Sequence, residues 1–192
     1  MRESGHSLVE VAAALGVMLA LAAMAVPWLR AYAVEAHLLG AGRVFKGEFL
    51  RTRSIAVRAN VQAAIRFEPA PDGTYFYSVY LDGNYNGVLS GDIARGVDRR
   101  IAGPRRLDAG APGVSVAIHP GVPAPPPDSG TLDPSRPIQF GRSGMLSFSP
   151  LGTATPGTFY LAGQGRQAAV RVTPGSARVR LMICRNGKWV ER

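Results

Sequence analysis

Glu10 is the one acidic residue inside a long apolar segment that runs from Leu8 to Leu29. At 1.5 Å per helical residue, this segment is long enough to cross a hydrocarbon layer of about 30 Å. A carboxylate inside that layer costs about 3 kcal/mol unless it is paired or lies near the interface. We therefore expect the segment to be a membrane anchor and Glu10 to meet a cationic partner.

A polar stretch beginning at Asp82, with the sequence Asp-Gly-Asn-Tyr-Asn-Gly, has the alternating oxygen ligands of a calcium loop. Its ligands would be Asp82, Asn84 and Asn86. A calcium loop also needs a bidentate acid at its twelfth position, where this chain has Ile93, and Asp92 comes one residue early. Because Asx and Gly residues also build tight turns without any ion, the stretch favours a turn, with a calcium site as the alternative.

Basic residues give the chain a net charge of +9 and gather in its C-terminal third. Arg171, Arg178 and Arg180 alternate along expected strands, so their side chains can share one face. The basic stretch continues with Arg185 and Lys188, and Trp189 offers a ring for stacking. Such a face indicates DNA binding, a solvated strand surface, or a surface that docks to acidic subunits.

Motifs with the spacing of an enzyme or cofactor site are incomplete. The stretch 163–168 matches a degenerate dinucleotide fingerprint, but a strand is expected after it where a helix N-terminus is needed, so it predicts a turn. The histidines His6, His37 and His119 have no metal-ligand spacing. The single cysteine, Cys184, excludes an intrachain disulfide and is expected to lie buried in a C-terminal strand. The sequence predicts a protein that is not an enzyme and carries no cofactor.

One long helix is expected to carry the N-terminal residues. Pro27, near the end of the apolar segment, would kink this helix by removing one backbone hydrogen bond. Beyond it, an Ala-rich stretch has apolar residues close to helical spacing at Val34, Leu38, Phe45, Phe49 and Ala56. We predict a membrane-spanning part at 6–30 and an amphipathic continuation at 31–60 that packs on a sheet.

After residue 60 the chain changes to short β-branched and aromatic runs separated by Gly and Pro turns. The expected strands are Val61 to Glu68, Thr74 to Leu81, Val114 to Ile118, Ile138 to Phe140, Met145 to Phe148, Thr158 to Ala162, Ala168 to Thr173 and Arg178 to Ile183. The Pro-rich segment 119–137 is expected to be an exposed, partly extended loop. The prediction is an α+β protein, with a long N-terminal helix packed on a small antiparallel β-rich domain at 61–192.

The N-terminal motif Gly5-His6-Ser7-Leu8-Val9-Glu10, followed by the apolar segment and Pro27, resembles the N-terminus of type IV pilins and pseudopilins. The resemblance implies that a prepilin peptidase cuts after Gly5 and removes a leader at 1–5. The new α-amino group of His6 would lie one helical turn from Glu10, and the carboxylate of one subunit would pair with the amine of its neighbour. The family usually has a methylated Phe at this position, where this chain has His6.

Two other interpretations of the N-terminus stay open. A secretory signal would be cut after Ala25, but the polar head balances one Arg against one Glu and an acid interrupts the apolar core. A plain signal anchor explains the length of the segment and leaves Glu10 unexplained. The pilin-like interpretation accounts for the length, the acid and Gly5 together.

The C-terminal half looks like that of the GspH/FimT group of minor pseudopilins, on the stretches 148–152, 156–161 and 169–172. The resemblance implies a pilin-like fold and an H-type minor pseudopilin of a type II secretion system, which supports protein secretion across the outer membrane. It also implies a single-pass protein of the bacterial inner membrane, with its N-terminus in the cytoplasm and its domain in the periplasm. Its partners would be other pseudopilins, met through the N-terminal helix.

Some FimT-type members capture DNA through a C-terminal Gly-Arg-x-Arg motif. This chain has Ala177-Arg178-Val179-Arg180, which keeps both arginines and lacks the leading Gly. The alternative function is therefore a FimT-like minor type IV pilin that binds DNA for uptake.

Overall fold

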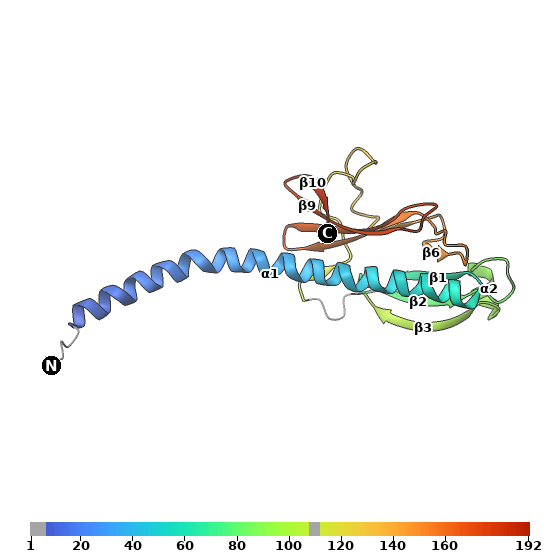
Figure 1. Ribbon diagram of the computed structural model, residues 1–192, viewed down its shortest axis with the longest axis horizontal. Coiled ribbons are helices and arrows are strands. Elements are labelled where there is room, and N and C mark those ends of the chain that lie inside the picture. Colours follow the sequence, from blue (N-terminus) through green and yellow to red (C-terminus); the bar gives the residue numbers. More distant parts are fainter. Residues whose placement is uncertain (1–6, 108–111) are drawn as a thin grey trace.

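The computed structural model describes residues 7–107 and 112–192. One helix, α1 (Leu8–Ala59), accounts for 52 of them and extends about 78 Å at 1.5 Å per residue. The Ser7 side chain caps its start by accepting the Val9 N–H at 3.4 Å, and Asn60 ends it in the left-handed conformation. Figure 1 shows that the N-terminal half of α1 projects away from the domain and that its C-terminal half lies along it.

The helix continues without interruption through Pro27, so the predicted continuation beyond the apolar segment is confirmed. In Figure 1, α1 curves gently along its length. Its first part, Leu8–Val26, is long and apolar enough to cross a membrane, and none of it is buried against the rest of the protein. A single membrane anchor at this end of the chain is compatible with this geometry.

Two antiparallel sheets form the domain (Figure 1). The first has the strand order β3-β2-β1-β6, and the second has the order β10-β9-β8-β7-β4, with β5 paired to β7. The bounds of these elements, with the short helix α2, are β1 (Ala63–Pro69), β2 (Tyr75–Leu81), α2 (Ser90–Arg95), β3 (Arg99–Arg106), β4 (Val114–Ser115), β5 (Ile138–Phe140), β6 (Met145–Phe148), β7 (Gly157–Gly163), β8 (Arg166–Val172), β9 (Val179–Arg185) and β10 (Lys188–Glu191).

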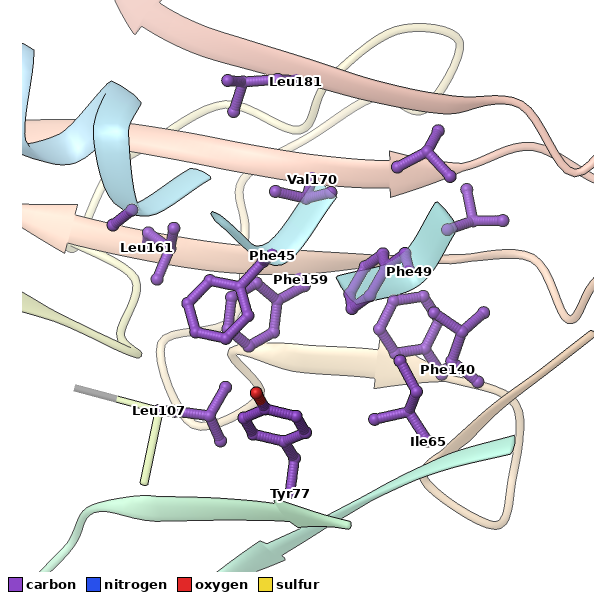
Figure 2. Close-up of a cluster of buried hydrophobic side chains, with 14 of the residues drawn as sticks. Phe45, Phe49, Ile65, Tyr77, Leu107, Phe140, Phe159, Leu161, Val170 and Leu181 are labelled. Atoms are coloured by element: carbon purple, nitrogen blue, oxygen red, sulfur yellow. The ribbon is translucent and has the colours of Figure 1, made fainter. Parts of the chain in front are cut away.

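The core lies where α1 packs against both sheets, as Figure 2 shows. Phe45 and Phe49 project from the helix onto Phe159 of β7, with the Phe45 and Phe159 ring centroids 4.7 Å apart. The predicted apolar stripe of the helix is confirmed, because four of its five members are buried and Val34 is half-buried. The C-terminal half of α1 is therefore part of the domain.

All eight predicted strands are present, most with ends shifted by one or two residues, and Val114 to Ile118 is shorter than predicted. Three elements, α2, β3 and β10, were not predicted from the sequence. The strand β3 has the sequence Arg-Arg-Ile-Ala-Gly-Pro-Arg-Arg, which lacks a β pattern because it is an edge strand with most side chains in solvent. Exposed charges and a proline protect such an edge from pairing with another chain.

The prediction of an exposed loop at 119–137 is wrong in part. This Pro-rich segment packs on the face of the second sheet that points away from α1, where Ile118 and Leu132 are buried against Tyr160 and Ala169. Within it, Pro123 and Thr131 form an antiparallel bridge, so the segment folds back on itself. Pro residues remove backbone donors but leave the carbonyls, and the sheet side chains bind those carbonyls.

Candidate functional site

Glu10 lies in the first turn of α1, where its backbone N–H donates to the Ser7 carbonyl at 3.0 Å. An acid at this position is favourable because the N-terminus of a helix carries a partial positive charge. The Glu10 side chain is exposed, as are the apolar residues that follow it up to Val26. Gly5 and His6, the predicted cleavage residues, lie outside the described residues. The backbone at Pro27 is helical.

The predicted calcium stretch is a turn built around one buried carboxylate. Asp82 is 6% exposed and accepts the backbone N–H groups of Asn84, Tyr85 and Gly87 at 2.8–3.0 Å. These three bonds hold Tyr85 in the left-handed conformation with its ring in solvent. The Asp82 oxygens thus already serve as the acceptors that organise the turn.

Two more buried acids support the same turn. Asp98, which the sequence analysis missed, accepts the N–H groups of Gly83 and Leu89 at 3.1 and 2.9 Å. Asp92 accepts the side-chain amides of Asn86 and Asn84 at 2.9 and 3.4 Å, and it pairs with Arg95. The role of Asp98 has no local sequence signal, because its partners lie 9 and 15 residues away.

Hydrogen bonds to the charged form of Asp92 explain its acidity. The amide of Asn86, then the guanidinium of Arg95 and the amide of Asn84, hold the pKa of Asp92 below its usual value, although burial acts in the opposite direction. Both Asn side chains turn their nitrogen atoms toward Asp92. Within residues 7–107 and 112–192, no group of three His, Cys, Asp or Glu side chains is placed to hold a metal ion. The calcium site stays a prediction.

Three of the five predicted DNA-binding residues lie together on the outer face of the second sheet. Arg171 of β8 is directly opposite Arg180 of β9. Arg180 and Arg178 converge on Glu191 of β10, at 3.8 and 2.9 Å. Their face is the one that the Pro-rich segment covers.

Acidic residues of the same domain already pair with these guanidinium groups. Arg171 is 15% exposed and contacts Asp128 at 2.8 Å and the carbonyl of Pro125 at 3.1 Å. Arg178 stays accessible, since 64% of its side chain is exposed beside Glu191. Arg171 is therefore fixed to the Pro-rich segment, and Arg178 is the cation of this group that is most open to a partner.

Arg185 and Lys188 lie on the other face of the same sheet. They pair across β9 and β10, and the Arg185 guanidinium binds Glu35 of α1. Arg166 of β8, which the sequence analysis did not single out, reaches the same carboxylate at 3.7 Å. The structure thus splits the predicted basic patch into an outer-face group and a group at the helix.

The remaining predicted positions have structural roles. The stretch 163–168 contains the predicted turn, which is formed by Gln164 and Gly165 between β7 and β8. Cys184 lies in β9 as expected, but it is half-buried rather than buried, and burial raises the pKa of its thiol. His119 contacts the backbone carbonyl of Gly163 at 3.3 Å through its ring.

Comparison with known proteins gives no match: no family model, no curated protein and no solved structure is similar to this chain.

Proposed function

We propose that this chain is an H-type minor pseudopilin, a structural subunit of a type II secretion pseudopilus that supports protein secretion across the outer membrane. A prepilin peptidase would remove the leader 1–5. Before assembly, α1 would anchor the subunit in the bacterial inner membrane, with its N-terminus in the cytoplasm and its domain in the periplasm. The protein would act through its contacts with other pseudopilins.

The division of α1 into two halves is the observation that carries this proposal. The residues from Leu8 to Val26 are apolar and have no cover from the domain, whereas Leu38 and Phe49 farther along the same helix are fully buried. Exposed apolar surface of this length needs lipid or other helices around it. A helix that exchanges lipid for the helices of neighbouring subunits satisfies this need both before and after assembly.

Glu10 would set the register of that assembly. In a bundle of such helices, an unpaired carboxylate is costly, and the α-amino group of His6 on a neighbouring subunit offers a cation at the right end of the helix. The pairing would bring the two opposite charges together in a dry interior. It also fixes how far one helix is displaced along the next.

Substitution of Glu10 tests this proposal. Glu10→Ala and Glu10→Gln should still float with membranes but should be missing from sheared filaments, because the anchor is intact and the pairing is lost. Glu68→Ala removes a half-buried acid of the domain, which contacts Arg66 at 3.2 Å, and serves as the matched control. Incorporation of both Glu10 variants at the level of the control would refute the pairing.

A second candidate function is that of a FimT-like minor type IV pilin that binds DNA. The convergence of Arg178 and Arg180 on the outer sheet face favours it. The full-length protein in detergent should then shift linear DNA with a strong salt dependence, and Arg178→Ala/Arg180→Ala should lose the shift. Arg99→Ala/Arg100→Ala, on the edge strand β3, removes the same charge elsewhere and should keep it. Absence of a shift at low salt would eliminate this candidate.

A further inference from the structure

The edge of the domain nearest to the apolar half of α1 is made of hairpin turns of the second sheet (Figure 1). The turn between β7 and β8 lies against the helix, because Gly163 is packed beside Val34. The turn residue Gln164 borders the same surface hollow as Ala33. Since Ala33 comes seven residues after Val26, this turn lies about 10 Å along the helix from the end of the apolar part.

In a bilayer crossed by α1, the lipid headgroups would lie close to these hairpin turns along the helix. The headgroup region adds about 5–8 Å on each side of the hydrocarbon core. A helix that leaves the hydrocarbon at Val26 therefore reaches the outer limit of the headgroups only a few ångströms before the hairpin turns. Charges at this edge would lie within one Debye length, about 8–10 Å, of the lipid phosphates.

The charge of this edge is positive. Arg166 begins β8, Arg185 ends β9 and Lys188 begins β10, so all three flank the two turns. Arg166 and Arg185 share the carboxylate of Glu35, which is 15% exposed, and their own side chains stay 35% and 41% exposed. Lys188 is exposed. Two of these three cations thus share one largely buried acid, and Lys188 lies opposite Arg185 on the neighbouring strand.

We infer that this basic edge, formed by Arg166, Arg185 and Lys188, rests on anionic phospholipid headgroups of the bilayer that α1 crosses. The inference depends on the membrane anchoring proposed above and adds a second contact with the same membrane. Each basic residue near an anionic surface contributes about 1 kcal/mol. The contact would hold the domain against the bilayer and would have to break when the subunit enters a filament.

Fluorescence quenching in vesicles tests the contact with the full-length protein. A fluorophore is placed at Gln164→Cys in a Cys184→Ser background, and the quencher is a lipid with a spin-labelled headgroup. Quenching should be strong in vesicles with a third of the lipid as phosphatidylglycerol, and weak in phosphatidylcholine alone or at high salt. The same fluorophore at Leu151→Cys should stay unquenched in all vesicles. Leu151 is exposed and precedes Gly152, which lies close to Arg53, a residue of α1 farther from the apolar part.

Removal of two charges gives the decisive comparison. Arg166→Gln/Lys188→Gln leaves Arg185 to hold Glu35, and it should lower the ratio of docked to undocked domain about thirty-fold. Arg99→Gln/Arg100→Gln on β3 is the matched control and should leave the ratio unchanged. Equal quenching in vesicles with and without phosphatidylglycerol would overturn the inference. Equal quenching of the Arg166→Gln/Lys188→Gln variant and the β3 control variant would also overturn it. If the protein instead fails to float with vesicles at all, it is the proposed anchoring that has failed.

Discussion

Trp189 of β10 donates its indole N–H to the backbone carbonyl of Pro123 at 2.8 Å, although 66 positions separate the two residues in the chain. With the bond from Arg171 to the carbonyl of Pro125, it fixes the Pro-rich segment to the outer face of the second sheet. The segment is thereby a layer of the domain. Its proline carbonyls accept hydrogen bonds from side chains on this face of the sheet.

Removal of this bond should loosen the Pro-rich segment. Trp189→Phe keeps a ring against Tyr160 and loses the N–H donor, so the free energy of unfolding should fall by about 1 kcal/mol. The amides of Ala124 and Leu132, which are bonded inside the segment, should exchange with solvent faster. Trp28→Phe in the apolar half of α1 is the control. Unchanged exchange in the Trp189 variant would show that the bond does not hold the segment.

Two glycines of α1 should respond to alanine with opposite signs. A Cβ on Gly42 would collide with the Leu181 side chain of β9, whereas a Cβ on Gly47 would meet open space. Gly47→Ala should stabilise the protein by about 1 kcal/mol through helix propensity. Gly42→Ala should destabilise it by about 1 kcal/mol, because displacement of a core leucine outweighs that gain. Chemical unfolding measures both, and stabilisation by Gly42→Ala would contradict the close approach of α1 to β9.

Acid should weaken the turn around Asp82 through Asp92. Since the pKa of Asp92 is lowered in the folded protein, its contribution to stability is fully present above the usual value of 3.8. It is lost as the pH falls below 3.8 and through the lowered pKa of the folded protein. Asn86→Ala removes the largest cause of the lowering, so it should raise the pKa of Asp92 and flatten the loss of stability in acid. A carboxyl titration by NMR measures the pKa. Asn84→Ala, which removes the longer bond, should have a smaller effect, and equal or absent shifts would contradict this assignment.

Much of the fold could be predicted from local patterns. The apolar stripe of α1 and the hairpin at Asp72, whose carboxylate accepts the Thr74 N–H at 3.0 Å, both follow from residues close in sequence. The Asp82 turn could be predicted as a turn for the same reason. Patterns of this kind indicate which element a segment forms and which of its faces is apolar.

Contacts between distant segments could not be predicted in this way. Glu35 of α1 binds Arg185, 150 residues away, and so separates Arg185 from the outer-face arginines with which the sequence grouped it. The packing of the Pro-rich segment could not be predicted either. Its composition indicates an extended backbone but does not indicate which face of the sheet it contacts. β3 was missed because an edge strand in solvent needs no apolar alternation.

Glu191 should restrain DNA binding if the outer-face arginines carry it. Glu191 contacts both Arg178 and Arg180, so Glu191→Gln removes a competing anion and should strengthen DNA binding at low salt. The salt dependence should steepen by about one ion for each arginine that is released. Glu68→Gln removes one negative charge from the first sheet and should change neither. A gel-shift titration at several salt concentrations measures both quantities, and equal binding by the two variants would argue against this face.

The N-terminal residue of the mature protein is the most direct test of the account as a whole. Purified from its native membrane and sequenced by Edman degradation or mass spectrometry, the chain should begin at His6, because assembly through Glu10 requires an α-amino group one turn away. A mature chain that begins at Val26 would have lost the apolar half of α1 together with Glu10. That result would make the protein an ordinary exported domain and would contradict the filament account.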